Sequence, residues 1–121
     1  PARRPGGSEE EKDAVISALD LRSHTAQGIR SALQGFKQLR VLVLSGSCLQ
    51  PDDLGLVLQG QGQLEKLDAS GCGLRQLPSE ELWEGLEKLR LLFLHSNELR
   101  SWTDLLAAVR PPNLAWLTLH C

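Results

Sequence analysis

Residues 89–99 read LRLLFLHSNEL, in which the leucines at 89, 92, 94 and 99 and the asparagine at 97 form a pattern and a further leucine stands at 91. Neither the 3.6-residue period of a helix nor the two-residue period of a strand produces this spacing. The same arrangement recurs along the chain. The copies are ISALDLRSHTA (16–26), LRVLVLSGSCL (39–49), LEKLDASGCGL (64–74) and LAWLTLHC (114–121). The last four copies start 25 residues apart, and the fainter first copy starts 23 residues before the second.

This self-similarity predicts a solenoid, in which each unit contributes one short parallel strand and a return segment. The pattern L-x-x-L-x-L-x-x-N/C-x-L resembles the leucine-rich repeat family, and the resemblance covers residues 16–121. It implies an α/β horseshoe with strands on the concave face and helical or irregular return segments on the convex face. We expect a disordered N-terminal arm over 1–13 and a repeat domain over 14–121, with about five repeats and the last one incomplete.

The asparagine position of the repeat varies between copies. It holds Asn97 in the fourth copy and Cys72 in the third, but Ser47 and His24 in the second and first. An asparagine there hydrogen-bonds backbone groups in the turn that leaves the strand. A hydroxyl or thiol does so less well, so we expect looser turns at the N-terminal end.

The return segments are amphipathic and helix-prone. In PSEELWEGLEKL (78–89), Ser79 is the expected N-cap, and Leu82 and Leu86 are expected to face the sheet. The segment SWTDLLAAVRPP (101–112) should end its helix at the two prolines. The segments GIRSALQGF (28–36) and PDDLGLVLQGQG (51–62) are predicted to be weaker helices, because their glycines lower helix stability.

The alternate strand residues should point away from the core, toward the concave face. A solvent-facing side of a sheet is normally polar, but here it carries several apolar and aromatic residues. An apolar patch rimmed by charge indicates a surface for a protein partner. An alternative is that further segments of the same protein cover the patch. The predicted partner-binding residues are Val41, Val43, Lys66, Asp68, Leu91, Phe93, His95, Trp116 and Thr118.

The composition argues against several other classes of function. The net charge of −2 over 121 residues provides no general attraction for nucleic acid or for an anionic membrane. We find no phosphate-binding loop, nucleophile signature or paired metal motif, so we predict no catalytic residue, cofactor or metal. His95 and His120 occupy one position in adjacent strands and could hold a metal, but no third or fourth ligand follows at a fixed spacing.

Two blocks, LPSEELWEGLEKLRLLFLHSNEL (77–99) and NLAWLTLHC (113–121), resemble the ciliary and flagellar leucine-rich repeat proteins, especially the leucine-rich repeat and IQ-motif group. The resemblance implies a non-enzymatic scaffold in a cytoskeletal, ciliary or axonemal assembly, and a cytoplasmic location. No IQ motif lies in these residues. Two alternatives stay open: a regulatory or targeting subunit of an enzyme such as a protein phosphatase, and an RNA-processing adaptor.

The C-terminal end is expected to be an exposed edge. Leu114, Leu117 and Leu119 would line it with no return segment behind them. A terminal repeat needs a polar cap to shield the core. We therefore expect the natural chain to continue past residue 121, or a partner to cover this edge, and we expect the isolated 1–121 fragment to associate.

The cysteines generate the first testable prediction. Cys48, Cys72 and Cys121 lie in separate turns of the predicted solenoid, and their odd number suits a reducing compartment. We expect all three thiols to be reduced and unmetallated. Thiol titration in denaturant, without added oxidant, should find three free groups, and a lower number would contradict this assignment.

Overall fold

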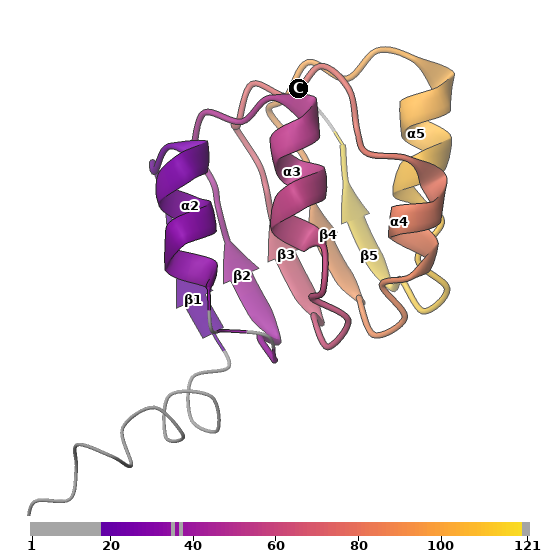
Figure 1. The fold of residues 1–121 in the computed structure, drawn as a ribbon. Coiled ribbons are helices and arrows are strands. Elements are labelled where there is room, and N and C mark those ends of the chain that lie inside the picture. Colours follow the sequence, from indigo (N-terminus) through magenta and orange to yellow (C-terminus); the bar gives the residue numbers. More distant parts are fainter. Residues whose placement is uncertain (1–17, 35, 37, 120–121) are drawn as a thin grey trace, which may run out of the picture.

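The computed structural model describes residues 18–34, 36 and 38–119. The predicted arm over 1–13, and His120 and Cys121 at the other end, lie outside these residues. Strands and helices alternate along the described chain (Figure 1). In order, they are β1 (Ala18–Asp20), α2 (Ala26–Leu33), β2 (Val41–Val43), α3 (Pro51–Leu58), β3 (Lys66–Asp68), α4 (Glu80–Glu84), β4 (Leu91–Phe93), α5 (Trp102–Ala108) and β5 (Trp116–Thr118).

The five strands form one parallel sheet in the order β1-β2-β3-β4-β5. Each strand pairs with the next at the equivalent repeat position, so that Leu42 lies opposite Leu67, and Leu67 opposite Leu92. Because the register never shifts, residues 25 positions apart stack in rows across the sheet. This confirms the predicted α/β solenoid with short parallel strands.

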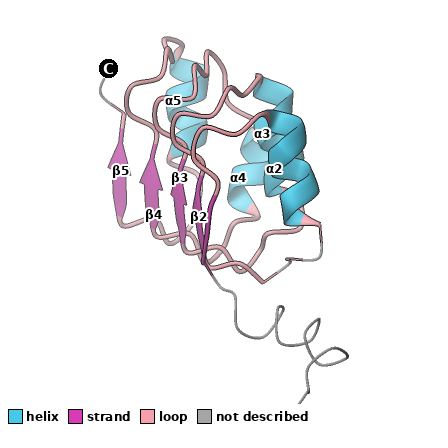
Figure 2. Cartoon of the chain, turned by 90° about the vertical axis from the view of Figure 1, so that its left-hand side faces the viewer, coloured by secondary structure: helices cyan, strands magenta, loops and turns pink. Residues whose placement is uncertain are grey.

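The core lies between the sheet and the layer of helices, which occupies one side of the sheet (Figure 2). Leu42, Leu67 and Leu92 are fully buried there, as the repeat pattern predicts. Their equivalent in the last repeat, Leu117, packs against the same core but stays partly exposed, as do Leu114 and Leu119. Within the described residues, the core leucines therefore become less buried toward β5.

The turns after β1, β2, β3 and β4 each have a residue in the left-handed backbone region at the same repeat position, and the turn after β3 has a second one at Gly73. The residues at the shared position are Ser23, Gly46, Gly71 and Ser96, with φ of 60°, 75°, 63° and 62°. Glycine adopts this conformation without the steric penalty that a Cβ brings. Each one directly precedes the asparagine position of its repeat, so the same sharp turn delivers that side chain to the same place every time.

The side chains at the asparagine position connect neighbouring repeats. Asn97 accepts hydrogen bonds through Oδ1 from the backbone N–H groups of Cys72 (2.9 Å) and Leu74 (3.0 Å). Its Nδ2 donates to the carbonyl of Ala69 in the preceding repeat, and to those of Leu94 and His95 in its own turn. The sequence predicted hydrogen bonds within the turn that leaves the strand. The structure adds bonds from Asn97 to the preceding repeat.

The substitutes at this position make fewer described bonds. The Cys72 thiol donates to the carbonyls of Leu44 and Ser70. The Ser47 hydroxyl donates to the carbonyl of Leu21 and accepts from the N–H of His24. Asn97 has five backbone partners, whereas the Cys72 thiol donates to two carbonyls and has further backbone hydrogen bonds at Ser47 and Gly46, and the Ser47 hydroxyl has two partners. The looser turns at the N-terminal end stay a prediction.

The relative strength of the helices was predicted wrongly. PSEELWEGLEKL, the segment with the most helical sequence signals, forms only the five-residue α4, whereas the glycine-containing α2 and α3 have eight residues each. Ser79 is the N-cap of α4, but its side chain makes no capping hydrogen bond. Helix α4 ends at Glu84, and Gly85 is its C-cap, with its N–H still bonded to carbonyls of the preceding turn.

The residue that α4 buries most deeply is Trp83. Leu86 lies beyond the end of the helix, and Leu82 is only partly buried, so the predicted pair four residues apart is not the main contact. Trp83 is fully buried and its indole N–H donates to the carbonyl of Pro78 at 3.2 Å. A tryptophan here fills space that leucine and alanine fill in the equivalent positions, Leu58 and Ala108.

None of the helices within the described residues is long and apolar enough to cross a membrane.

Trp83 provides a test of this packing. Trp83→Ala should lower the free energy of unfolding by about 3–5 kcal/mol, because it removes a large buried side chain and leaves a cavity. Trp102→Ala is the matched control: that side chain is 77% exposed, and its loss should change stability by less than about 0.5 kcal/mol. Urea unfolding followed by circular dichroism measures both. Equal effects would contradict the assignment of Trp83 to the core.

Candidate functional site

The parallel register brings together the nine residues predicted for partner binding, on the side of the sheet opposite the helices. We call this side the concave face. Two rows of side chains cross it. The first row contains Val41, Lys66, Leu91 and Trp116, and the second contains Val43, Asp68, Phe93 and Thr118. His95 follows two residues after Phe93 on the same side.

The apolar residues of the concave face differ in exposure. Trp116 is 60% exposed, whereas Val41, Val43, Leu91 and Phe93 are half-buried. Neighbouring strands lie close enough for their side chains to cover one another in part. Trp116 lies on β5, where only one neighbouring strand is described, and this accounts for its greater exposure.

Lys66 and Asp68 divide the concave face into two apolar areas. The pair Val41 and Val43 lies on β2, and the cluster of Leu91, Phe93 and Trp116 lies on β4 and β5. The Lys66 ammonium lies 5.5 Å from the centre of the Phe93 ring, within the range of a cation–π interaction. The charged strand is therefore in direct contact with the aromatic cluster.

Hydrogen bonds hold the polar side chains of the concave face in place. Asp68 Oδ1 accepts from both the hydroxyl and the backbone N–H of Ser70, at 2.6 and 3.1 Å. His95 Nδ1 lies 2.7 Å from the Thr118 hydroxyl. The His95 ring also meets the Phe93 ring edge-on, with 6.3 Å between their centres. These contacts hold the side chains of Asp68, His95 and Phe93 in defined positions on the concave face.

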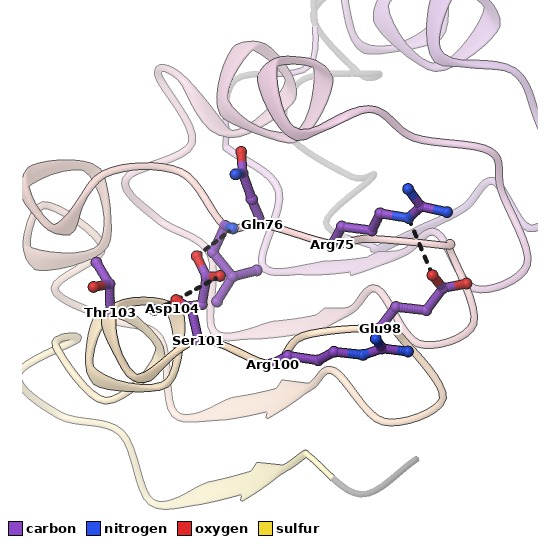
Figure 3. A pocket seen from close by; sticks show the side chains of 8 residues that line it. Arg75, Gln76, Glu98, Arg100, Ser101, Thr103 and Asp104 are labelled. Carbon is purple, nitrogen blue, oxygen red and sulfur yellow. Dashed lines mark hydrogen bonds and ion pairs between the residues drawn. The ribbon is translucent and has the colours of Figure 1, made fainter.

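Apart from the concave face, a depression lies at the edge where the chain leaves the strands, and the sequence did not predict it (Figure 3). It has a volume of about 600 Å³ between the loops after β3 and β4. Arg75 pairs with Glu98 across it, and Asp104 accepts a hydrogen bond from the N–H of Leu77. The repeat period could have found it, since Arg75 and Arg100 are 25 residues apart and both line it.

Asp104 is a structural part of this depression. It is buried, and its Oδ1 lies 2.9 Å from the backbone nitrogen of Leu77 in the preceding repeat. Its Oδ2 accepts from the Ser101 hydroxyl, which in turn accepts from the Asp104 N–H at the start of α5. Its carboxylate thus ties α5 to the preceding repeat.

The described residues contain no group of three or more His, Cys, Asp or Glu side chains that could hold a metal. Cys48 and Cys72 are free thiols, the first exposed and the second buried. Burial raises the pKa of the Cys72 thiol from its ordinary 9.0 to about 11, although a backbone hydrogen bond at Ser47 opposes the shift. A thiol that stays protonated is a poor nucleophile, so Cys72 fits a structural role.

Comparison with known structures identifies the architecture. The C-terminal domain of tropomodulin from Caenorhabditis elegans superposes with a TM-score of 0.64, covering 95% of this chain and 80% of that one, at 12% sequence identity. The fold is that of a leucine-rich repeat solenoid. The repeats lie in register along it, and the concave face is the outward side of its strands.

Sequence comparison points to a more specific relationship. The repeats are similar to leucine-rich repeat and IQ domain-containing protein 3, with 32% identity to the Rattus norvegicus protein over 92% of this chain. Identity is 37% to the Mus musculus protein over 74% of the chain, and 33% to the Homo sapiens protein over 72%. The chain spans only 17%, 13% and 14% of the lengths of these relatives. No protein-family model matches the sequence.

The Cys72 thiol gives a prediction for pH dependence. Because folding raises its pKa, the thiol contributes stability that is fully present below about pH 9 and is lost as the pH rises through about 11. The decline in unfolding free energy between pH 9 and 11, measured with urea, should be smaller in Cys72→Ala than in the unchanged protein. Cys48→Ala is the control and should keep the full decline. Identical profiles for all three proteins would contradict the assignment.

Proposed function

We propose that this repeat domain is a non-enzymatic protein-interaction scaffold that binds a protein partner on its concave face. The observation that carries the proposal is the cluster of Leu91, Phe93 and Trp116, which the register assembles on the side of the sheet away from the helices. No second layer covers this side within the described residues. An apolar cluster with aromatic members and a charged border is typical of a partner surface.

The proposed setting is a cytoplasmic assembly of the cytoskeleton, cilium or axoneme. Support for it comes from the resemblance of residues 77–99 and 113–121 to the leucine-rich repeat and IQ-motif group, and from the similarity to leucine-rich repeat and IQ domain-containing protein 3 over most of this chain. The setting is independent of the binding face, because a concave partner surface would serve a scaffold in any compartment.

Substitutions on the two faces test the proposal. Phe93→Ala and Trp116→Ala should each weaken partner binding by roughly 2 kcal/mol or more, as loss of an aromatic anchor does at an interface. The partner is obtained by affinity purification with the whole protein, followed by mass spectrometry. Its affinity for each variant is then measured by calorimetry.

Two controls lie away from the concave face. Trp102→Ala removes a tryptophan, as Trp116→Ala does, but from α5 on the helical side. Glu84→Ala removes an exposed ion-pair partner of Arg110. Both should leave binding nearly unchanged. If the controls weaken binding more than Phe93→Ala and Trp116→Ala, while all four variants stay folded, the concave face is not the partner surface.

A further inference from the structure

The spacing of the rows on the concave face restricts the shape of what can bind there. Neighbouring strands lie about 4.8 Å apart, and an α-helix advances about 5.4 Å per turn. A helix laid across the strands therefore places about one turn over each strand. From β2 to β5, which is three strand steps (Figure 2), the two spacings diverge by only about 2 Å. Side chains can absorb that difference.

An extended segment fits the same rows poorly. Its same-face side chains repeat about every 6.6 Å, so at each step the next side chain overshoots the next strand by about 1.8 Å. Over three steps the error is about 5 Å, which is more than one strand spacing. The two rows lie two residues apart along each strand, about 6.6 Å, and a helix about 10 Å wide covers both.

The charges at the centre of the face restrict the chemistry of the occupant. Lys66 and Asp68 are half-buried and lie between the two apolar areas, so a helix that reaches both areas must pass over them. Only Oδ1 of Asp68 is engaged in the hydrogen bonds described, both from Ser70. A wholly apolar occupant would shield Lys66 and Asp68 from water and offer neither an opposite charge, leaving only the Phe93 ring beside Lys66 and the Ser70 hydrogen bonds to Asp68, which is costly. The occupant must therefore place an acidic side chain against Lys66 and a basic side chain against Asp68.

We propose, on the basis of the proposed function, that the partner presents an amphipathic α-helix that lies across β2 to β5. The helix carries apolar residues at positions i, i+7 and i+11, which reach Val41 with Val43, Leu91 with Phe93, and Trp116. At positions i+3 and i+4 it carries one acidic and one basic residue. These two positions lie in the same turn on either side of the helix face, so the acid meets Lys66 and the base meets Asp68.

Selection from a displayed library of random linear 20-residue peptides, with the whole 121-residue chain as target, tests this pattern without assuming it. Peptides that lose at least about tenfold in affinity against Phe93→Ala and Trp116→Ala are kept as concave-face binders. These peptides should carry apolar residues at positions i, i+7 and i+11 and opposite charges at i+3 and i+4. Their circular dichroism spectrum should become more helical on binding. A proline placed at the central turn should weaken them about a hundredfold.

A charge variant tests the central turn separately. Selection against Lys66→Glu should exchange the acidic preference for a basic one, while selection against Glu87→Lys, an exposed residue away from the concave face, should return the original pattern. Circular dichroism and urea unfolding confirm that both variants are folded.

The outcomes separate this inference from the proposed function. Concave-face binders that tolerate the central proline, or that keep the same charge preference against Lys66→Glu, overturn the helical partner and leave the concave face as a binding surface. If no selected peptide depends on Phe93 or Trp116, both the helical partner and the proposed function are overturned.

Discussion

The hydrogen bonds of Asn97 to the backbone of the preceding repeat are the interaction on which the rest of the structure depends. One side chain satisfies the N–H groups of Cys72 and Leu74 and the carbonyl of Ala69, all of which belong to the turn one repeat earlier. Buried backbone groups are costly when they have no partner. Asn97 thus completes the turn before its own repeat, and from β2 to β5 paired strands lie at a fixed offset of 25 residues.

The fixed offset determines the composition of each surface. Since equivalent residues stack in rows, a leucine at the inward strand position becomes part of a continuous core, and the residue beside it becomes part of a continuous row on the concave face. A single charged strand can then divide two apolar areas, as Lys66 and Asp68 do. The same regularity makes the spacing between the rows of the concave face a property of the sheet, and the proposal of a helical rather than an extended partner follows from that spacing.

The helical side was less predictable, because packing there depends on how much space each return segment must fill. PSEELWEGLEKL has an N-cap, acidic residues in its first turn and apolar residues four apart, yet it forms the shortest of the described helices. Trp83 is large enough to fill the interior from a single turn, and the helix then ends at Glu84, with Gly85 as its C-cap. The eight-residue α3 contains Gly55, where an added Cβ would come within 3.7 Å of the Pro78 side chain in the next repeat. The lengths of α3 and α4 thus follow the packing of each return segment rather than its helix propensity.

The sequence by itself determined the solenoid, its strand positions and the nine residues of the candidate concave surface, because all of these follow from a period that can be counted along the chain. Only the tertiary structure showed that Asn97 bonds mainly to the previous repeat, that Lys66 lies over Phe93, and that Arg75 and Glu98 pair across a depression between two loops. These features join residues on different repeats or strands. Their distances depend on side-chain direction and packing, which no periodicity in one dimension can specify.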